Sequence, residues 1–262
     1  MPNVCDESER LKEIFNLMFS KLASISIGDN FVREIDLRRK AKFDKNKPDS
    51  FFYEKLVETI HGANIKSSTV KKYWNGIAKS FLDFNVVAVS KFTGDNLAGM
   101  VKNPKLIRNE KKLRDCIENA KIMVEISKEY GSFGNYLDKY RNNSDNLAAI
   151  LMNKFHFLGK ILVFNYLKEV GIDAIKPDVR VCRVMYRLGL IDSLKDIDKV
   201  AAVAKEMAGV VGEKLNVIDA VFWMYGGSGD NHIQKAVCSK NKPLCDECPL
   251  TEYCVLYKAH KI

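Results

Sequence analysis

Four cysteines near the C-terminus have a spacing that can hold a metal centre. Cys238, Cys245, Cys248 and Cys254 follow the pattern C-x6-C-x2-C-x5-C. Four thiolates this close in sequence can surround one soft centre, either a tetrahedral zinc ion or an iron–sulfur cluster. Zinc sites usually have two short C-x2-C pairs, whereas this segment has one, and its wider gaps favour a 4Fe–4S cluster. Two disulfides are the alternative, and they would require an oxidising compartment.

A second candidate for chemistry is Asp178, which follows Pro177 at the start of an expected helix. A carboxylate in this position caps the helix N-terminus. A fixed carboxylate can also stabilise the positive charge that develops on a sugar during hydrolysis of an N-glycosidic bond, or orient the attacking water. Both roles are compatible, because the cap would hold the side chain in place. The same helix carries a basic face, which is either solvated or in contact with phosphates: Arg180, Arg183 and Arg187.

The segment FHFLGK lies between two apolar stretches and predicts a helical hairpin that can hold a DNA strand. Gly159 allows a phosphate to approach the backbone, and Lys160 lies where the N–H groups of the following helix favour an anion. An ordinary turn between helices is the alternative. His61 and His156 are further candidates for contact with a base or a phosphate, although lone histidines more often satisfy a local hydrogen bond. Trp74 and Trp223 could stack on a base, although aromatic residues on helices are usually core.

The composition favours an intracellular protein with a polyanionic partner. The chain has 262 residues, with 42 Lys and Arg against 33 Asp and Glu, and a formal net charge of +9. Its 47% of hydrophobic residues exclude global disorder. No apolar run long enough for a membrane span occurs, and the acidic start lacks the apolar stretch of a signal peptide. Three cysteines outside the C-terminal group are expected to be reduced thiols: Cys5, Cys116 and Cys182.

Apolar residues recur at helical spacing along nearly the whole chain, and no alternating pattern of useful length predicts a strand. We therefore expect an all-α fold. The basic stretch 31–50 is interpreted as a linker, with Ser50 as the cap of the next helix. Helices are expected at about 6–27, 51–62, 67–83, 93–101, 109–131, 134–140, 145–153, 178–188, 194–211 and 215–225.

Together these motifs resemble the endonuclease III-like DNA glycosylases of the helix-hairpin-helix superfamily. The shared order is a hairpin, a helix, a glycine, then Pro-Asp-x-x-x-x-Arg-Val-x-x-Arg-Leu-Gly from Pro177, then the cysteine loop. The similarity covers roughly residues 50 to 254. It implies a six-helix domain with the hairpin at 50–171 and a C-terminal helical domain with the cysteine loop at 172–262. Residues 1–49, an N-terminal helix and basic linker, would pack with the C-terminal domain.

The resemblance also implies roles for individual residues. DNA would lie between the two domains with the target nucleotide flipped out of the stack, and Asp178 would be the catalytic aspartate. Asn64 is the candidate for the side chain that fills the vacated space, although it could simply end a helix. Lys240 and Lys242 would contact phosphates. The four cysteines would hold a structural 4Fe–4S cluster.

Two departures from the family pattern concern the hairpin. Phe157 stands where the family has its first hairpin glycine, so phosphate contact there should be less intimate. The hairpin sequence is closer to that of the 3-methyladenine DNA glycosylase I type, which lacks the catalytic aspartate and favours an alkylated purine as substrate. The second departure concerns the position at which glycosylases that also cleave the DNA backbone carry a nucleophilic lysine. Alignment on Gly159 places Ile161 there, whereas counting back from Asp178 places Lys160.

We therefore expect a monomeric DNA glycosylase of base excision repair that acts on double-stranded DNA containing a damaged base. With Ile161 at the lysine position the enzyme would use water and be monofunctional, and this alignment is favoured. Two alternatives stay open: a bifunctional glycosylase and abasic-site lyase that uses Lys160, and a non-catalytic damage-binding module. The expected location is the cytoplasm of a prokaryote, in association with the nucleoid, and no membrane association is expected.

Overall fold

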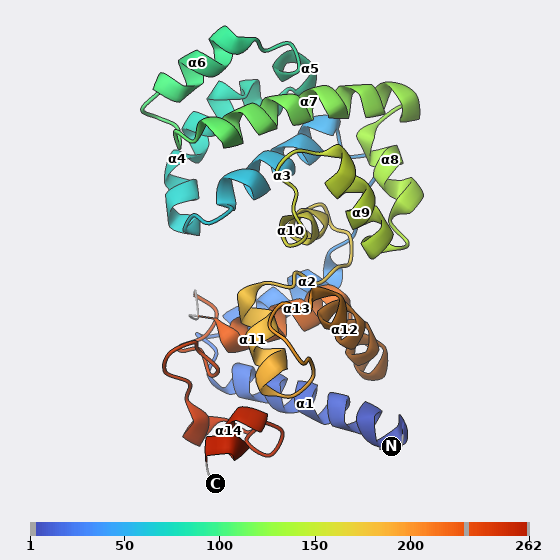
Figure 1. Cartoon of the computed structure of the whole chain (residues 1–262), viewed down its shortest axis with the longest axis vertical. Helices are drawn as coiled ribbons and strands as arrows, with labels where there is room; N and C mark the ends of the chain where they lie inside the picture. Colours follow the sequence, from blue (N-terminus) through green and yellow to red (C-terminus); the bar gives the residue numbers. More distant parts are fainter. Residues whose placement is uncertain (1–3, 228–230, 261–262) are drawn as a thin grey trace. The chain divides into compact units, whose positions relative to one another are not determined.

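The computed structural model describes residues 4–227 and 231–260 (Figure 1). These residues lie in helices and in the segments between them. The described ranges contain no strand and one isolated β-bridge, between Ser26 and Ile233. The expected all-α class is therefore confirmed. None of the helices in this part of the chain combines the length and the apolar character that crossing a membrane requires.

The chain divides into two compact units, and each is described by itself. The terminal unit combines Met1–Ala41 with Asp173–Ile262, and the central unit is Lys42–Ile172. The second boundary lies close to the one expected at 171. The first lies before the expected position at 49, because residues 42–49 belong to the central unit.

The terminal unit is built around α13 (Leu215–Gly226), an almost wholly apolar helix (Figure 1). It packs against α1, α2, α11 and α12, and its Val217 and Phe222 are fully buried. Burial of apolar surface of this kind contributes roughly 25 cal/mol per Å². The other elements of this unit are α1 (Val4–Ser24), α2 (Asn30–Lys40), α11 (Val179–Arg187), α12 (Ile197–Val211), the 3₁₀ turn η2 (Cys245–Glu247) and α14 (Val255–His260).

Helix α2 corrects the expectation that residues 31–50 form a linker. Phe31 and Ile35 lie one turn apart on one face of the helix, and both side chains are fully buried. Through this face α2 packs against α1 and α13. Charged residues outnumber apolar ones in this stretch, so the narrow apolar stripe gives a weak helical signal. Only residues 41–48 are non-helical between α2 and α3.

The central unit contains more helices than the six that the resemblance implies. Its longest helix, α7 (Glu110–Tyr130), packs against α3, α5, α6 and α8 and ends at Gly131, which has a φ of 80° as expected of a C-terminal glycine. Pro48, not Ser50, precedes the first helix of the unit. The remaining elements are α3 (Asp49–Gly62), α4 (Ser67–Ser80), η1 (Leu82–Phe84), α5 (Val86–Val89), α6 (Gly94–Lys102), α8 (Phe133–Tyr140), α9 (Ser144–Lys154) and α10 (Leu162–Glu169).

His61 lies in the core of the central unit. Its side chain is fully buried, its Nδ1 lies 3.0 Å from the carbonyl oxygen of Val57, and its ring meets Phe81 edge-on at 6.0 Å. Among the described residues its Nε2 has no hydrogen-bond partner. Burial lowers the pKa of His61 to about 4, because desolvation penalises the charged ring. The hypothesis that His61 contacts a base or a phosphate is therefore corrected.

The buried imidazole predicts a pH dependence of stability. The pKa of His61 is lower in the folded protein than its ordinary value of 6.5, so protonation favours the unfolded chain. The contribution of neutral His61 is full above pH 6.5 and is lost as the pH falls towards about 4, by about 3 kcal/mol in total. Urea unfolding across this range should show a shallower pH slope in His61→Phe than in the wild type. Equal slopes would contradict the account.

Gly134 allows α8 to touch the segment before α3. A Cβ atom at this position would lie 2.0 Å from the carbonyl oxygen of Lys45, and this contact involves backbone that cannot rotate away. Gly134→Ala should therefore destabilise the protein by about 1–3 kcal/mol in urea unfolding. Gly99→Ala is the control, because nothing lies within 4 Å of its added Cβ atom. Alanine on this exposed turn of α6 should stabilise by about 0.5–1 kcal/mol. Equal effects of the two variants would contradict the close approach.

Candidate functional site

Asp178 caps α11, as the sequence analysis expected. Its backbone is extended, and its Oδ1 accepts hydrogen bonds from the N–H groups of Arg180 (2.8 Å) and Val181 (3.2 Å). The side chain is half-buried, and in the described part of the chain its Oδ2 has no hydrogen-bond partner. The cap therefore fixes one carboxylate oxygen and leaves the other for a ligand or a water molecule.

The segment that leads to Asp178 is itself held by α13. Asp173 accepts hydrogen bonds from the N–H groups of Leu215 (3.1 Å) and Asn216 (2.9 Å), at the start of α13. Buried Asp219, one turn further along this helix, accepts one from the N–H of Lys176 (2.7 Å). Charge-assisted bonds of this type are stronger than neutral ones. Position and direction of the Asp178 side chain are thus set by α13 as well as by α11.

The four cysteines of the C-terminal group surround one cavity. The cavity has a volume of about 290 Å³, and all four of these side chains line it together with Arg187. The described cysteines are free, so the disulfide alternative has no support among them. In the described residues no group of three or more His, Cys, Asp or Glu side chains closes around a single metal ion. The metal centre therefore stays a prediction.

Hydrogen bonds reach three of these sulfur atoms. Arg187 Nη1 lies 3.3 Å from Cys238 Sγ, and the Tyr225 hydroxyl lies 3.1 Å from Cys248 Sγ. The backbone N–H of Tyr257 donates to Cys254 Sγ at 3.4 Å. Donors in these positions stabilise thiolates, which are the form that binds metals. Burial and the neighbouring thiols raise the pKa of Tyr225, which keeps its hydroxyl protonated as a donor.

The arginines of α11 have partners within the terminal unit. Arg187 donates to the carbonyl oxygens of Ser239 (2.8 Å) and Lys240 (3.2 Å), in addition to its bond with sulfur. Arg183 donates to the carbonyl oxygens of Gly226 and Cys238, and the Arg180 guanidinium lies 4.6 Å from the Trp223 ring centroid. The interpretation of this face as phosphate-binding or merely solvated is therefore corrected. Its side chains hold the cysteine loop and the end of α13.

Lys240 and Lys242 lie exposed on the loop between the first two cysteines. The Ser239 hydroxyl closes this loop by donating to the carbonyl oxygen of Lys242 at 2.6 Å. In residues 4–227 and 231–260 neither ammonium group has an acidic partner. The loop thus presents two unpaired cations, and the expected contact with phosphates stays a prediction.

The hairpin of the central unit is the turn 155–161 between α9 and α10. Phe157 has a φ of 68°, so this phenylalanine adopts the left-handed conformation that glycine would take more easily. Such a residue costs on the order of 1–3 kcal/mol unless its surroundings hold it. Buried Asn119 accepts from the N–H of His156 (2.8 Å) and donates to its carbonyl oxygen (2.9 Å). Nothing lies within 4 Å of the Cβ position at Gly159, so the turn is open there.

The two candidates for the lysine position both lie at the end of this turn. Lys160 is exposed, and Ile161 precedes the first residue of α10 with 39% of its surface exposed. Neither side chain is buried in the core, so packing does not distinguish the two positions. Both alignments therefore stay open.

Asn64 lies in the turn after α3, exposed and with a φ of 58°. Asparagine adopts this conformation more readily than most residues and often ends a helix in this way. The almost fully buried ammonium of Lys112 donates to the carbonyl oxygens of His61 (3.0 Å) and Ala63 (2.6 Å) and so fixes the turn. The interpretation as a helix end agrees with this geometry, and insertion into DNA stays a prediction.

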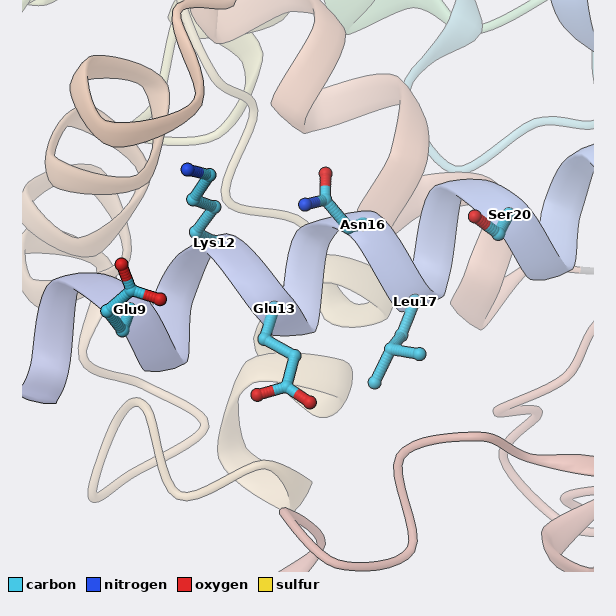
Figure 2. A pocket seen from close by; sticks show the side chains of 6 residues that line it. All are labelled: Glu9, Lys12, Glu13, Asn16, Leu17 and Ser20. Carbon is cyan, nitrogen blue, oxygen red and sulfur yellow. The ribbon is translucent and has the colours of Figure 1, made fainter.

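A shallow pocket of about 330 Å³ along α1 holds none of the candidate residues. Figure 2 shows that Lys12 and Asn16 point to one side of the helix, whereas Glu13 and Leu17 point to the other. The side chains of this pocket come from one helix: Glu9, Lys12, Glu13, Asn16, Leu17 and Ser20. Because they do not converge on one point, the pocket carries no functional interpretation.

Comparisons with known proteins agree with the motifs. Residues 44–150 match the methyladenine glycosylase family. The 8-oxoguanine DNA glycosylase of Methanocaldococcus jannaschii is similar in structure, with a TM-score of 0.53 and 17% identity over 80% of this chain and 92% of that chain. Two further structures were found. The 8-oxoguanine DNA glycosylase of Thermotoga maritima has a TM-score of 0.49 and 17% identity, over 87% of this chain and 97% of that chain. The 3-methyladenine DNA glycosylase I of Staphylococcus aureus has a TM-score of 0.46 and 20% identity, over 52% and 84%.

The family match and the structural likeness cover overlapping parts of the chain. The family match covers the central unit almost from its start to the middle of α9. The archaeal structure shares the fold over both units, since it covers 80% of this chain. The resemblance to DNA glycosylases is confirmed: residues 44–150 match the methyladenine glycosylase family, and the fold is similar to that of an 8-oxoguanine DNA glycosylase.

Proposed function

We propose that this DNA glycosylase removes a damaged base from duplex DNA by hydrolysis, with Asp178 as the catalytic carboxylate. The proposal rests on the Asp178 carboxylate, of which only one oxygen accepts hydrogen bonds. Its Oδ1 is fixed by two backbone N–H groups, and its Oδ2 has no partner in the described part of the chain. A preorganised charge with one free oxygen is suited to stabilise positive charge on a sugar.

The proposed step breaks the bond between C1′ of the sugar and the nitrogen of the base. The electron pair of this bond leaves with the base, and positive charge develops on the sugar. The oxygen of a water molecule then bonds to C1′, and the proton that it loses passes to the carboxylate or to solvent. Asp178 stabilises the charge and orients the water. The product is an abasic site with an intact backbone.

An alkylated purine is the proposed substrate. Alkylation of a ring nitrogen gives the base a positive charge, so it leaves as a neutral group and needs little help from a general acid. The match of residues 44–150 to the methyladenine glycosylase family supports this choice, and the hairpin sequence agrees with it. Lys160 lies exposed in the hairpin turn, so abasic-site lyase activity remains the second candidate.

Asp178→Asn separates catalysis from folding. Asparagine caps a helix about as well as aspartate, so thermal stability and binding to an abasic-site duplex should equal those of the wild type. Base release from an alkylated duplex should fall by about 10²–10⁴-fold, because the charge is gone. Asp178→Ala is the control for the cap and should lose about 1 kcal/mol of stability as well. Base release at the wild-type rate in Asp178→Asn would remove this residue from the mechanism.

We further propose that the four cysteines hold a 4Fe–4S cluster with a structural role. Support comes from the shared cavity of about 290 Å³, the free thiols and the donors to three of the sulfur atoms. Cys238, Cys245, Cys248 and Cys254 would be the ligands. A bound cluster would cross-link the loop and would take no part in the reaction of the base. The loop would then present Lys240 and Lys242 to phosphates.

Reconstitution tests this proposal without reference to activity. Incubation of the reduced protein with iron and sulfide should give a brown protein with broad visible absorbance and a raised melting temperature. Cys248→Ser should not reconstitute. Arg187→Met should bind less iron, because the donor to Cys238 Sγ and the loop carbonyls is lost. Arg33→Met, in an exposed side chain of α2, is the matched control. A colourless protein that takes up one zinc ion would contradict the cluster.

A further inference from the structure

The hairpin keeps a strained phenylalanine where a glycine would fit more easily. Phe157 has a φ of 68° and is half-buried. Glycine would adopt this conformation without strain, and the proposed grip on DNA would gain from a closer approach of the backbone to a phosphate. Residues held in strained conformations are often found at functional sites. A phenylalanine at this position therefore requires a role that glycine could not fulfil.

Two ammonium groups lie near this ring, and their environments differ. Lys111 Nζ lies 5.3 Å and Lys112 Nζ lies 5.7 Å from the ring centroid. Lys112 is almost fully buried, and its ammonium donates to two backbone carbonyl oxygens of the turn after α3. The Lys111 side chain has 68% of its surface exposed. Lys112 is thus part of the internal structure, whereas Lys111 faces solvent beside the hairpin.

Lys111 occupies an unfavourable place for a cation. It lies in the first turn of α7, where the positive end of the helix dipole repels it. Its partner is Asp115 (2.6 Å), whose side chain has only 9% of its surface exposed, and a lysine four residues before an acid is the less favourable order. The other acid of this turn, Glu110, is paired with Arg114. Lys111 thus compensates the buried Asp115 carboxylate, while its exposed ammonium keeps further N–H donors.

We infer that Lys111, held over the Phe157 ring, binds a DNA phosphate beside the hairpin and replaces the backbone contact of the missing glycine. The inference rests on the proposed function, since it assigns a DNA contact to the hairpin. An ammonium has three N–H donors, of which Asp115 takes one. The ring restricts the side chain through a cation–π interaction and leaves the remaining donors directed to solvent. Positive charge from Lys111 and the start of α7 combines beside Phe157.

Lys111→Gln and Lys128→Gln form a matched pair. Both lysines lie on α7, their side chains have 68% and 67% of their surface exposed, and each is paired with an acid on the same helix. Binding to a duplex with a tetrahydrofuran abasic-site analogue would be measured by fluorescence anisotropy over a series of salt concentrations. Lys111→Gln should weaken binding about tenfold and reduce the slope of log K against log salt by about one. Lys128→Gln should behave as the wild type.

Two further variants separate the phosphate contact from a structural role. Lys111→Arg keeps the charge and should restore the wild-type salt slope. Phe157→Gly should fold with equal or higher thermal stability, because the strain is relieved, but should show the smaller salt slope of Lys111→Gln. A destabilised Phe157→Gly with an unchanged salt slope would assign the ring to packing and overturn its part of the inference.

The outcomes also separate this inference from the proposed function. If the wild type binds the duplex and the two glutamine variants have equal slopes and affinities, the Lys111 contact is overturned and the proposed function stands. If the wild type binds no duplex at any salt concentration, both are overturned. A selective loss of affinity and slope in Lys111→Gln, restored by arginine, supports the contact.

Discussion

Helix α11 is the element on which the candidate site of the terminal unit depends. Asp178 accepts two N–H groups at its start, and Arg187 in its last turn donates to Cys238 Sγ and to the cysteine loop. Only nine residues make up this helix, and an isolated helix of that length is not stable in water. Its stability comes from the buried face with Val181 and Met185, which packs on α13. The Asp178 carboxylate and the cysteine loop are therefore both positioned by the packing of α11 on α13.

A comparable constraint operates within the central unit. It comes from the buried side chain of Lys112. Its ammonium donates to carbonyl oxygens of the turn that carries Asn64, and it lies near the ring of Phe157. Both of these residues have left-handed backbones, and neither is glycine. Two turns that the superfamily resemblance assigns to DNA binding thus depend on one buried cation. This explains why a lysine can be tolerated in the core: its charge satisfies carbonyl oxygens at a helix end.

The sequence predicted the helices well and the partners of side chains poorly. Periodicity located α7, α11 and α13 because each has a continuous apolar stripe, whereas α2 buries only Phe31 and Ile35 and carries many charges. The N-cap of Asp178 was predictable because its partners lie two and three residues away. The hydrogen bond from Arg187 to Cys238 was not predictable, because Cys238 lies 51 residues further along the chain. The left-handed backbone at Phe157 could not be predicted either, since phenylalanine rarely adopts this conformation.

The most direct test of the account is base release by the wild-type protein from a panel of duplexes, each with one lesion. Alkylated purines, 8-oxoguanine and mismatched bases would be included, and each sample would be split into an untreated half and a half treated with heat and alkali. The account predicts strand breaks only after alkali, and first of all in the alkylated duplexes. Breaks in the untreated half would instead show lyase chemistry and favour Lys160. Binding without release of any base would contradict the central claim that this chain is a catalyst.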